Sequence, residues 1–158
     1  MPPNPEADPR LDAFRETSME FDSVYGLLAK SCGLSDTEYW ALVLIHEGLV
    51  TQREISEQLS LSRQTLNSAF KQLIKKGLIR LEPLENDQRS KQAILTDEGE
   101  RFVEANVVRV KQLEAQAWQT LSREEQAMLI RLTHQFSVAL RHSLQAQTKP
   151  NHQSSEDL

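Results

Sequence analysis

The chain has 158 residues, which suits one ordinary domain and excludes a large multidomain enzyme. Its formal net charge of -5 argues against a protein that coats nucleic acid or membranes with its whole surface, and its single cysteine excludes an intrachain disulfide. The sequence starts without a basic, then apolar, secretory signal and lacks the roughly 20-residue apolar run of a membrane-spanning helix. We therefore expect a soluble, cytoplasmic protein with no membrane partner.

Helical patterns fill most of the chain between residues 10 and 147. Periodicity predicts helices over about 11–30, 36–47, 52–59, 61–77, 97–118 and 123–147. Gly33, Gly48 and Gly77 each stand where a helical pattern stops, as expected of glycines that end helices. Residues 1–9 hold four prolines and residues 148–158 are polar, so we expect both ends to be disordered.

Several predicted helices begin with a hydroxyl residue followed three positions later by a glutamate, the spacing of a capping box. These pairs are Ser35 with Glu38, Thr51 with Glu54, and Ser122 with Glu125. In a capping box each side chain satisfies a backbone amide that the helix start leaves free. The three pairs therefore fix the starts of the helices at about residues 36, 52 and 123.

Residues 61–77, LSRQTLNSAFKQLIKKG, form a predicted helix with one apolar and one polar face, and Ser62 is its expected N-cap. Leu66, Ala69, Phe70, Leu73 and Ile74 fall in one arc at 100° per residue. No acid occurs between residues 61 and 80. The segment 51–92 carries a net charge of +3 and the rest of the chain -8, the layout expected when one surface meets a polyanion.

After this helix, residues 78–84 and 90–95 have strand-type composition around a polar turn at 85–89, which predicts a β-hairpin. Pro83 places its strand at the edge of the sheet. A short helix, a tight turn, a basic-faced helix and a hairpin make a winged helix-turn-helix. The expected fold is therefore mainly α with a small hairpin wing.

A helix of this kind fits the major groove of double-stranded DNA. We expect base-edge contacts from Gln64, Asn67 and Ser68, and phosphate contacts from Arg63, Thr65, Lys71 and Lys75. Ser62 is a further expected DNA contact. Acids at these positions would be repelled by phosphate, which explains their absence. The alternative is a surface helix whose lysines and glutamines only keep the protein in solution.

The segment 51–99 resembles the MarR family of bacterial transcription regulators. The resemblance rests on ISEQLSLSRQTLNSAFKQLIKKGLI, on the wing ENDQRSKQAIL and on LTDEG, which opens the next long helix. It implies a single domain over residues 10–147, with residues 34–96 as the winged helix-turn-helix and with 10–31 and 97–147 as dimerisation helices. It also implies a homodimer on a pseudo-palindromic operator, with half-sites about 10 base pairs apart or a multiple of that.

The resemblance assigns further residues to the wing. Arg89 is the wing arginine expected to enter the minor groove, with Lys91 as a further DNA contact, and Asp87 is expected to fix the shape of the turn. Gln88 and Leu81 stand where arginines are frequent in the family. Those two departures affect the expected affinity and sequence preference of the wing.

Family members often respond to small aromatic or phenolic molecules, and the resemblance places Phe21, Tyr25, Tyr39 and Trp40 on segments that would line such a site. The alternative for each ring is an ordinary place in the core. Cys32 is a candidate redox sensor by the same resemblance, although no base adjoins it in the sequence to stabilise a thiolate. No histidine pattern indicates a metal site.

We therefore expect a DNA-binding transcriptional regulator, a repressor released by a small molecule. The alternatives are a thiol- or metal-responsive regulator of the same fold, and a dimeric scaffold that does not bind DNA. The sequence offers no phosphate-binding glycine loop, no histidine pair at metal spacing and no nucleophile motif. It therefore predicts neither an enzyme nor a cofactor.

Overall fold

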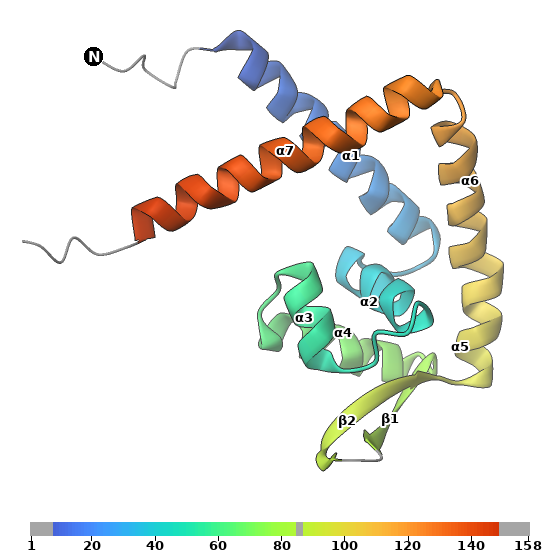
Figure 1. Cartoon of the computed structure of the whole chain (residues 1–158). Coiled ribbons are helices and arrows are strands. Elements are labelled where there is room, and N and C mark those ends of the chain that lie inside the picture. The colour runs from blue at the N-terminus through green and yellow to red at the C-terminus, as the bar shows by residue number, and fades with distance from the viewer. Residues whose placement is uncertain (1–7, 85–86, 149–158) are drawn as a thin grey trace, which may run out of the picture. The chain divides into compact units, whose positions relative to one another are not determined.

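The computed structural model describes residues 8–84 and 87–148, and for residues 87–89 and 148 it describes the backbone alone. The chain divides into two compact units, Met1–Lys111 and Gln112–Leu158, which are described separately. Figure 1 shows the elements in chain order. None of the helices in the described ranges combines the length and the apolar character that a membrane-spanning segment requires.

Helix α1, Pro9–Ser31, starts two residues earlier than the sequence pattern predicts, within the segment expected to be disordered. The carboxylate of Asp8 caps it by accepting a hydrogen bond from the Arg10 amide, and Pro9 occupies the first turn, where its missing N–H costs nothing. Of its side chains only Ala29 is fully buried. Most of the apolar side of α1 is thus not covered by the single chain.

Three short helices build the core of the first unit: α2 (Asp36–His46), α3 (Gln52–Leu59) and α4 (Arg63–Lys75). The capping boxes predicted for α2 and α3 are present, and the predicted capping box of the last helix also forms. Leu42, Ile55, Leu66 and Phe70 are completely buried where the three helices meet. Burial of this apolar surface is what fixes α4 against α2 and α3.

The hairpin consists of β1 (Ile79–Leu84) paired antiparallel with β2 (Asp87–Leu95). The second strand begins at residue 87 rather than at residue 90, so part of the predicted turn is strand. On its other side β2 is tied to the start of α3, because the Ala93 amide donates to the Val50 carbonyl at 2.7 Å and Thr51 bridges to Gln92. That leaves β1 at the edge, the position predicted from Pro83.

The segment 97–118, predicted as one helix, contains a π-helical turn. Helix α5 (Asp97–Phe102) passes into η2 (Val103–Val107) and then into α6 (Val108–Trp118). The Asn106 amide group donates to the Phe102 carbonyl at 2.9 Å and so satisfies a backbone acceptor inside the widened turn. Val103, Val107 and Val110 bury their side chains in the first unit.

The second unit contains the end of α6 and the long helix α7, Arg123–Thr148. The Gln126 side chain donates to the Trp118 and Leu121 carbonyls and closes the turn between the two helices. Large apolar side chains on α7 are exposed in the single chain: Met128, Leu129, Ile130, Leu132, Phe136, Val138, Leu140 and Leu144.

Candidate nucleic-acid interface

Helix α4 separates its buried and exposed faces as the sequence predicts, with one exception. Leu66, Ala69, Phe70 and Leu73 are buried, which orients the rest of the helix. The exception is Ile74, predicted to be in the core but 42% exposed, because it lies at the edge of the apolar arc near the end of the helix. The exposed side chains from the candidate interface are Ser62, Arg63, Gln64, Thr65, Asn67, Ser68, Lys71 and Lys75.

The first turn of α4 is held by hydroxyl groups. The predicted N-cap is confirmed, since Ser62 Oγ accepts a hydrogen bond from the Thr65 amide at 3.1 Å and lies 2.8 Å from Thr65 Oγ1. Ser68 Oγ donates to the Gln64 carbonyl at 3.1 Å, which leaves its lone pairs as acceptors. An acid-free helix start with free backbone amides attracts anions.

The remaining polar groups of this face are not engaged within the part of the chain that the structure describes. Neither a hydrogen bond nor an ion pair ties down the side chains of Gln64, Asn67, Lys71 or Lys75 among the described residues. The two amides can each donate and accept, and the two ammonium groups can each donate to phosphate. The helix thus offers both kinds of group that DNA recognition requires.

A groove of about 570 Å³ lies between the start of α3, the start of α4 and the hairpin. Three of its lining residues, Arg53, Arg63 and Lys91, are basic, and none is acidic. Leu81 and Leu84 form its apolar part. The groove therefore extends the positive character of α4 to the wing.

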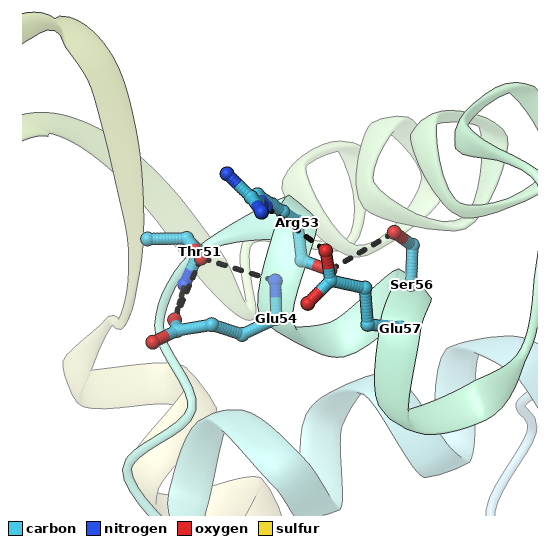
Figure 2. Close-up of polar contacts among 5 residues, drawn as sticks. All are labelled: Thr51, Arg53, Glu54, Ser56 and Glu57. Atoms are coloured by element: carbon cyan, nitrogen blue, oxygen red, sulfur yellow. Dashed lines mark hydrogen bonds and ion pairs between the residues drawn. The ribbon is translucent and has the colours of Figure 1, made fainter.

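The base at the α3 side of this groove is paired. Arg53 Nε donates to Glu57 Oε1 at 2.9 Å across one helical turn, and this hydrogen bond raises the pKa of Arg53 further above its usual range (Figure 2). Thr51 donates from both its hydroxyl and its amide to Glu54 Oε2, which lowers the pKa of Glu54. Figure 2 shows that Ser56 also donates to the Arg53 carbonyl, so the start of α3 is tightly connected.

The structure brings Lys91 to the groove, where its side chain is exposed. Arg89 and Asp87 lie in strand β2, but their side chains are outside the described part of the structure, as is that of Gln88. Leu81, which stands where an arginine is frequent, lines the groove instead of contributing charge to it. The assignment of Arg89 to the minor groove stays a prediction.

The four candidate ligand-binding rings are in contact with one another. Phe21 packs edge-on against Tyr25 with centroids 5.0 Å apart, and Trp40 contacts Tyr25 and Tyr39 at 5.4 Å each. Tyr39 is only 2% exposed and belongs to the core, whereas Phe21 is exposed. Aromatic pairs of this geometry stabilise a fold whether or not a ligand is present.

The candidate redox residue Cys32 is half-buried just beyond the end of α1. Its sulfur lies 3.9 Å from Ser31 Oγ. Within residues 8–84 and 87–148 no three histidine, cysteine or acidic side chains come together as a metal site would need. Thiol sensing stays a prediction.

Arg53 and Lys76 contribute to the positive charge of residues 51–92, but the sequence did not predict what either side chain contacts. The spacing of Arg53 and Glu57, four residues apart on a helix, was the signal for the ion pair in Figure 2. Lys76 contacts Glu38, 38 residues away, and the Gly33 carbonyl. No local pattern could indicate that contact, because it depends on how the helices pack.

The comparison with known families and structures agrees with this geometry. Residues 33–90 match the model of the MarR family. No curated protein matches the sequence. A MarR family regulator from Neisseria meningitidis has a similar structure, with a TM-score of 0.76 and 18% identity, covering 88% of this chain and 99% of that one.

Two further solved structures are similar. MepR from S. aureus, in a complex with DNA, has a TM-score of 0.64 and 25% identity and covers 80% of this chain and 95% of its own. BpsR from Bordetella bronchiseptica, whose DNA binding is regulated by 6-hydroxynicotinic acid, has a TM-score of 0.66 and 16% identity, with 84% and 94% covered. Residues 33–90 of this chain thus match the MarR family model, and the structure shows the winged helix-turn-helix fold of the MarR family regulator from Neisseria meningitidis.

Proposed function

We propose that this protein is a sequence-specific regulator of transcription that binds double-stranded DNA with α4 in the major groove. The observation that carries the proposal is the acid-free exposed face of α4, held in place by four buried apolar side chains. The proposed contacts are Ser62, Arg63, Gln64, Thr65, Asn67, Ser68, Lys71 and Lys75 on α4, and Arg89 and Lys91 on the wing. The DNA complex of MepR supports this use of the fold.

The proposed active species is a homodimer formed by residues 10–31 and 97–147. Support comes from the apolar side chains on α1 and α7 that the single chain leaves exposed, since such faces are normally buried against a partner. Sedimentation equilibrium of the purified protein should give twice the mass of 18.1 kDa. A monomer that persists at micromolar concentration would contradict a dimer.

The direct test of DNA binding is selection of bound duplexes from a random pool, followed by measurement of affinity by fluorescence anisotropy. We expect an inverted repeat whose half-sites lie about 10 base pairs apart or a multiple of that, as a two-fold protein requires. Enrichment of no sequence, with binding that vanishes at moderate salt, would contradict sequence-specific recognition and favour the scaffold alternative.

We further propose that the regulator is a repressor, released when a small aromatic or phenolic molecule binds beside Phe21, Tyr25 and Trp40. BpsR, which responds to an aromatic acid, supports this class of ligand. The sequence has only two tryptophans, so Trp118→Phe leaves Trp40 as the sole reporter. Hydroxylated aromatic acids that quench Trp40 and also release DNA would support the proposal, whereas release without quenching would place the ligand elsewhere.

A further inference from the structure

Lys76 lies directly after the last turn of α4, and its side chain, 36% exposed, contacts residues that precede α4, whereas that of Lys75 has no partner among the described residues. Its ammonium group donates to Glu38 Oε2 at 2.9 Å and to the Gly33 carbonyl at 3.1 Å. Glu38 is only 5% exposed, although it carries a charge. The pair therefore joins the end of α4 to the start of α2 and to the turn that follows α1.

The same carboxylate oxygen also belongs to the capping box of α2. Glu38 Oε2 accepts from the Ser35 amide at 2.7 Å as well as from Lys76. Burial would raise the pKa of Glu38, but the Ser35 amide and the Lys76 ammonium outweigh burial, so the pKa lies below its usual range. Glu38 Oε2 thus connects α2 to Lys76 at the end of α4. These two donors stabilise the negative charge of the buried carboxylate.

We infer that Lys76 is a positioning residue, which fixes the tilt of α4 through Glu38 and Gly33 and does not contact DNA. This inference rests on the proposed binding of DNA by α4. The competing assignment is that Lys76 is one more phosphate contact, like Lys71 and Lys75. Counting charges cannot distinguish a positioning role from a phosphate contact, because Lys71, Lys75 and Lys76 all lie on the same basic segment.

The two assignments predict opposite effects of Glu38→Gln on operator affinity. If Lys76 contacts phosphate, removing the acid beside it frees the ammonium group and raises affinity. If Lys76 positions α4, removing the acid releases the helix end and lowers affinity for the operator. Affinity for random DNA, which needs charge more than exact helix placement, should change little in the second case.

The test compares Lys76→Gln, Glu38→Gln, Lys76→Arg and the matched control Lys75→Gln in the full chain, with circular dichroism confirming that each is folded. Lys75 is exposed and unpaired among the described residues, so Lys75→Gln should flatten the salt dependence of binding by about one unit of slope. Lys76→Gln and Glu38→Gln should each lower operator affinity by about tenfold, with the slope of the salt dependence unchanged. Lys76→Arg, which keeps the positive charge, should retain most of the operator affinity of the parent.

Two results would overturn the inference: Lys76→Gln flattening the slope as Lys75→Gln does, or Glu38→Gln binding the operator as tightly as the parent or more tightly. If Lys76→Gln does not fold, the sign of the Glu38→Gln effect decides alone. Failure of the proposed function looks different, because the parent itself would then show no preference for any duplex.

Discussion

Gly99, in the first turn of α5, packs directly against the backbone carbonyl of Leu78, and a Cβ at Gly99 would collide with that oxygen. Thr96 reinforces the contact, since its hydroxyl donates to the Gly77 carbonyl at 2.5 Å and its amide to the Leu78 carbonyl at 3.1 Å. The start of α5 is therefore held against the turn between α4 and β1. This contact explains the glycine of the LTDEG sequence, because only a residue without a Cβ allows the backbone of α5 to lie this close to the Leu78 carbonyl.

Gly99→Ala should consequently lower the free energy of unfolding by about 3 kcal/mol, as expected when an added methyl group meets backbone that cannot move aside. Gly26→Ala in α1 is the matched control. There a Cβ would meet the Asp36 carboxylate at an ordinary 3.5 Å, so the same change should raise stability by about 0.5 to 1 kcal/mol. Urea unfolding followed by circular dichroism gives both values, and equal effects would contradict the packing argument.

Ser60 forms the turn between α3 and α4 in a left-handed conformation, with φ 52° and ψ 37°. A side chain makes this conformation costly, so Ser60→Gly should raise the free energy of unfolding by about 0.5 to 1 kcal/mol. Ser60→Ala keeps the Cβ and should give no such gain. A stabilisation by alanine equal to that by glycine would show that the strain at this turn is not the cause.

The lowered pKa of Glu38 makes part of the stability depend on pH. Because the charged carboxylate is favoured in the folded state, its contribution is complete above the ordinary value of 4.5 and is lost as pH falls through the lowered folded-state value. The difference in unfolding free energy between the parent and Glu38→Gln should therefore shrink as the medium is acidified below that range. Urea unfolding across a pH series measures it, and a constant difference would mean that the charge is not responsible.

Arg89 and Lys91 are the two basic residues that we propose as DNA contacts of the wing. Arg89→Ala and Lys91→Ala should each lower affinity and flatten the plot of log affinity against log salt by about one unit, since each removes one phosphate or groove contact. Arg141→Ala, an exposed change on α7, serves as the control and should leave the slope unchanged. An unaltered slope for Arg89→Ala would remove this residue from the interface.

Local sequence signals predicted the local features of this fold. Capping boxes, the Ser62 N-cap and the glycines that end helices depend on neighbouring residues only, and Gly33, Gly48 and Gly77 all have the positive φ that such ends require. The exposed face of α4 followed from helical periodicity for the same reason. Each of these features involves residues no more than about four positions apart.

Features that depend on packing between distant segments could not be read from the sequence. The Lys76–Glu38 pair and the π-helical turn at residues 103–107 both lie where α2 meets α4 and the segment after the wing. The length of β2 was also underestimated, because its backbone pairs with β1 as far back as Asp87, which lies opposite Leu84 beyond a register shift. A charge count could place Lys76 on the basic segment but could not show that its ammonium group pairs with Glu38.

The most direct test of base reading by α4 is the ratio of operator affinity to random-DNA affinity in Gln64→Ala, Asn67→Ala and Ser68→Ala, with Gln119→Ala, in the turn after α6, as the control. We expect each α4 variant to lose operator affinity by about 1 to 3 kcal/mol per base contact while its affinity for random DNA is unchanged, and the control to match the parent. If all three α4 variants keep the ratio of the parent, α4 does not read the base sequence.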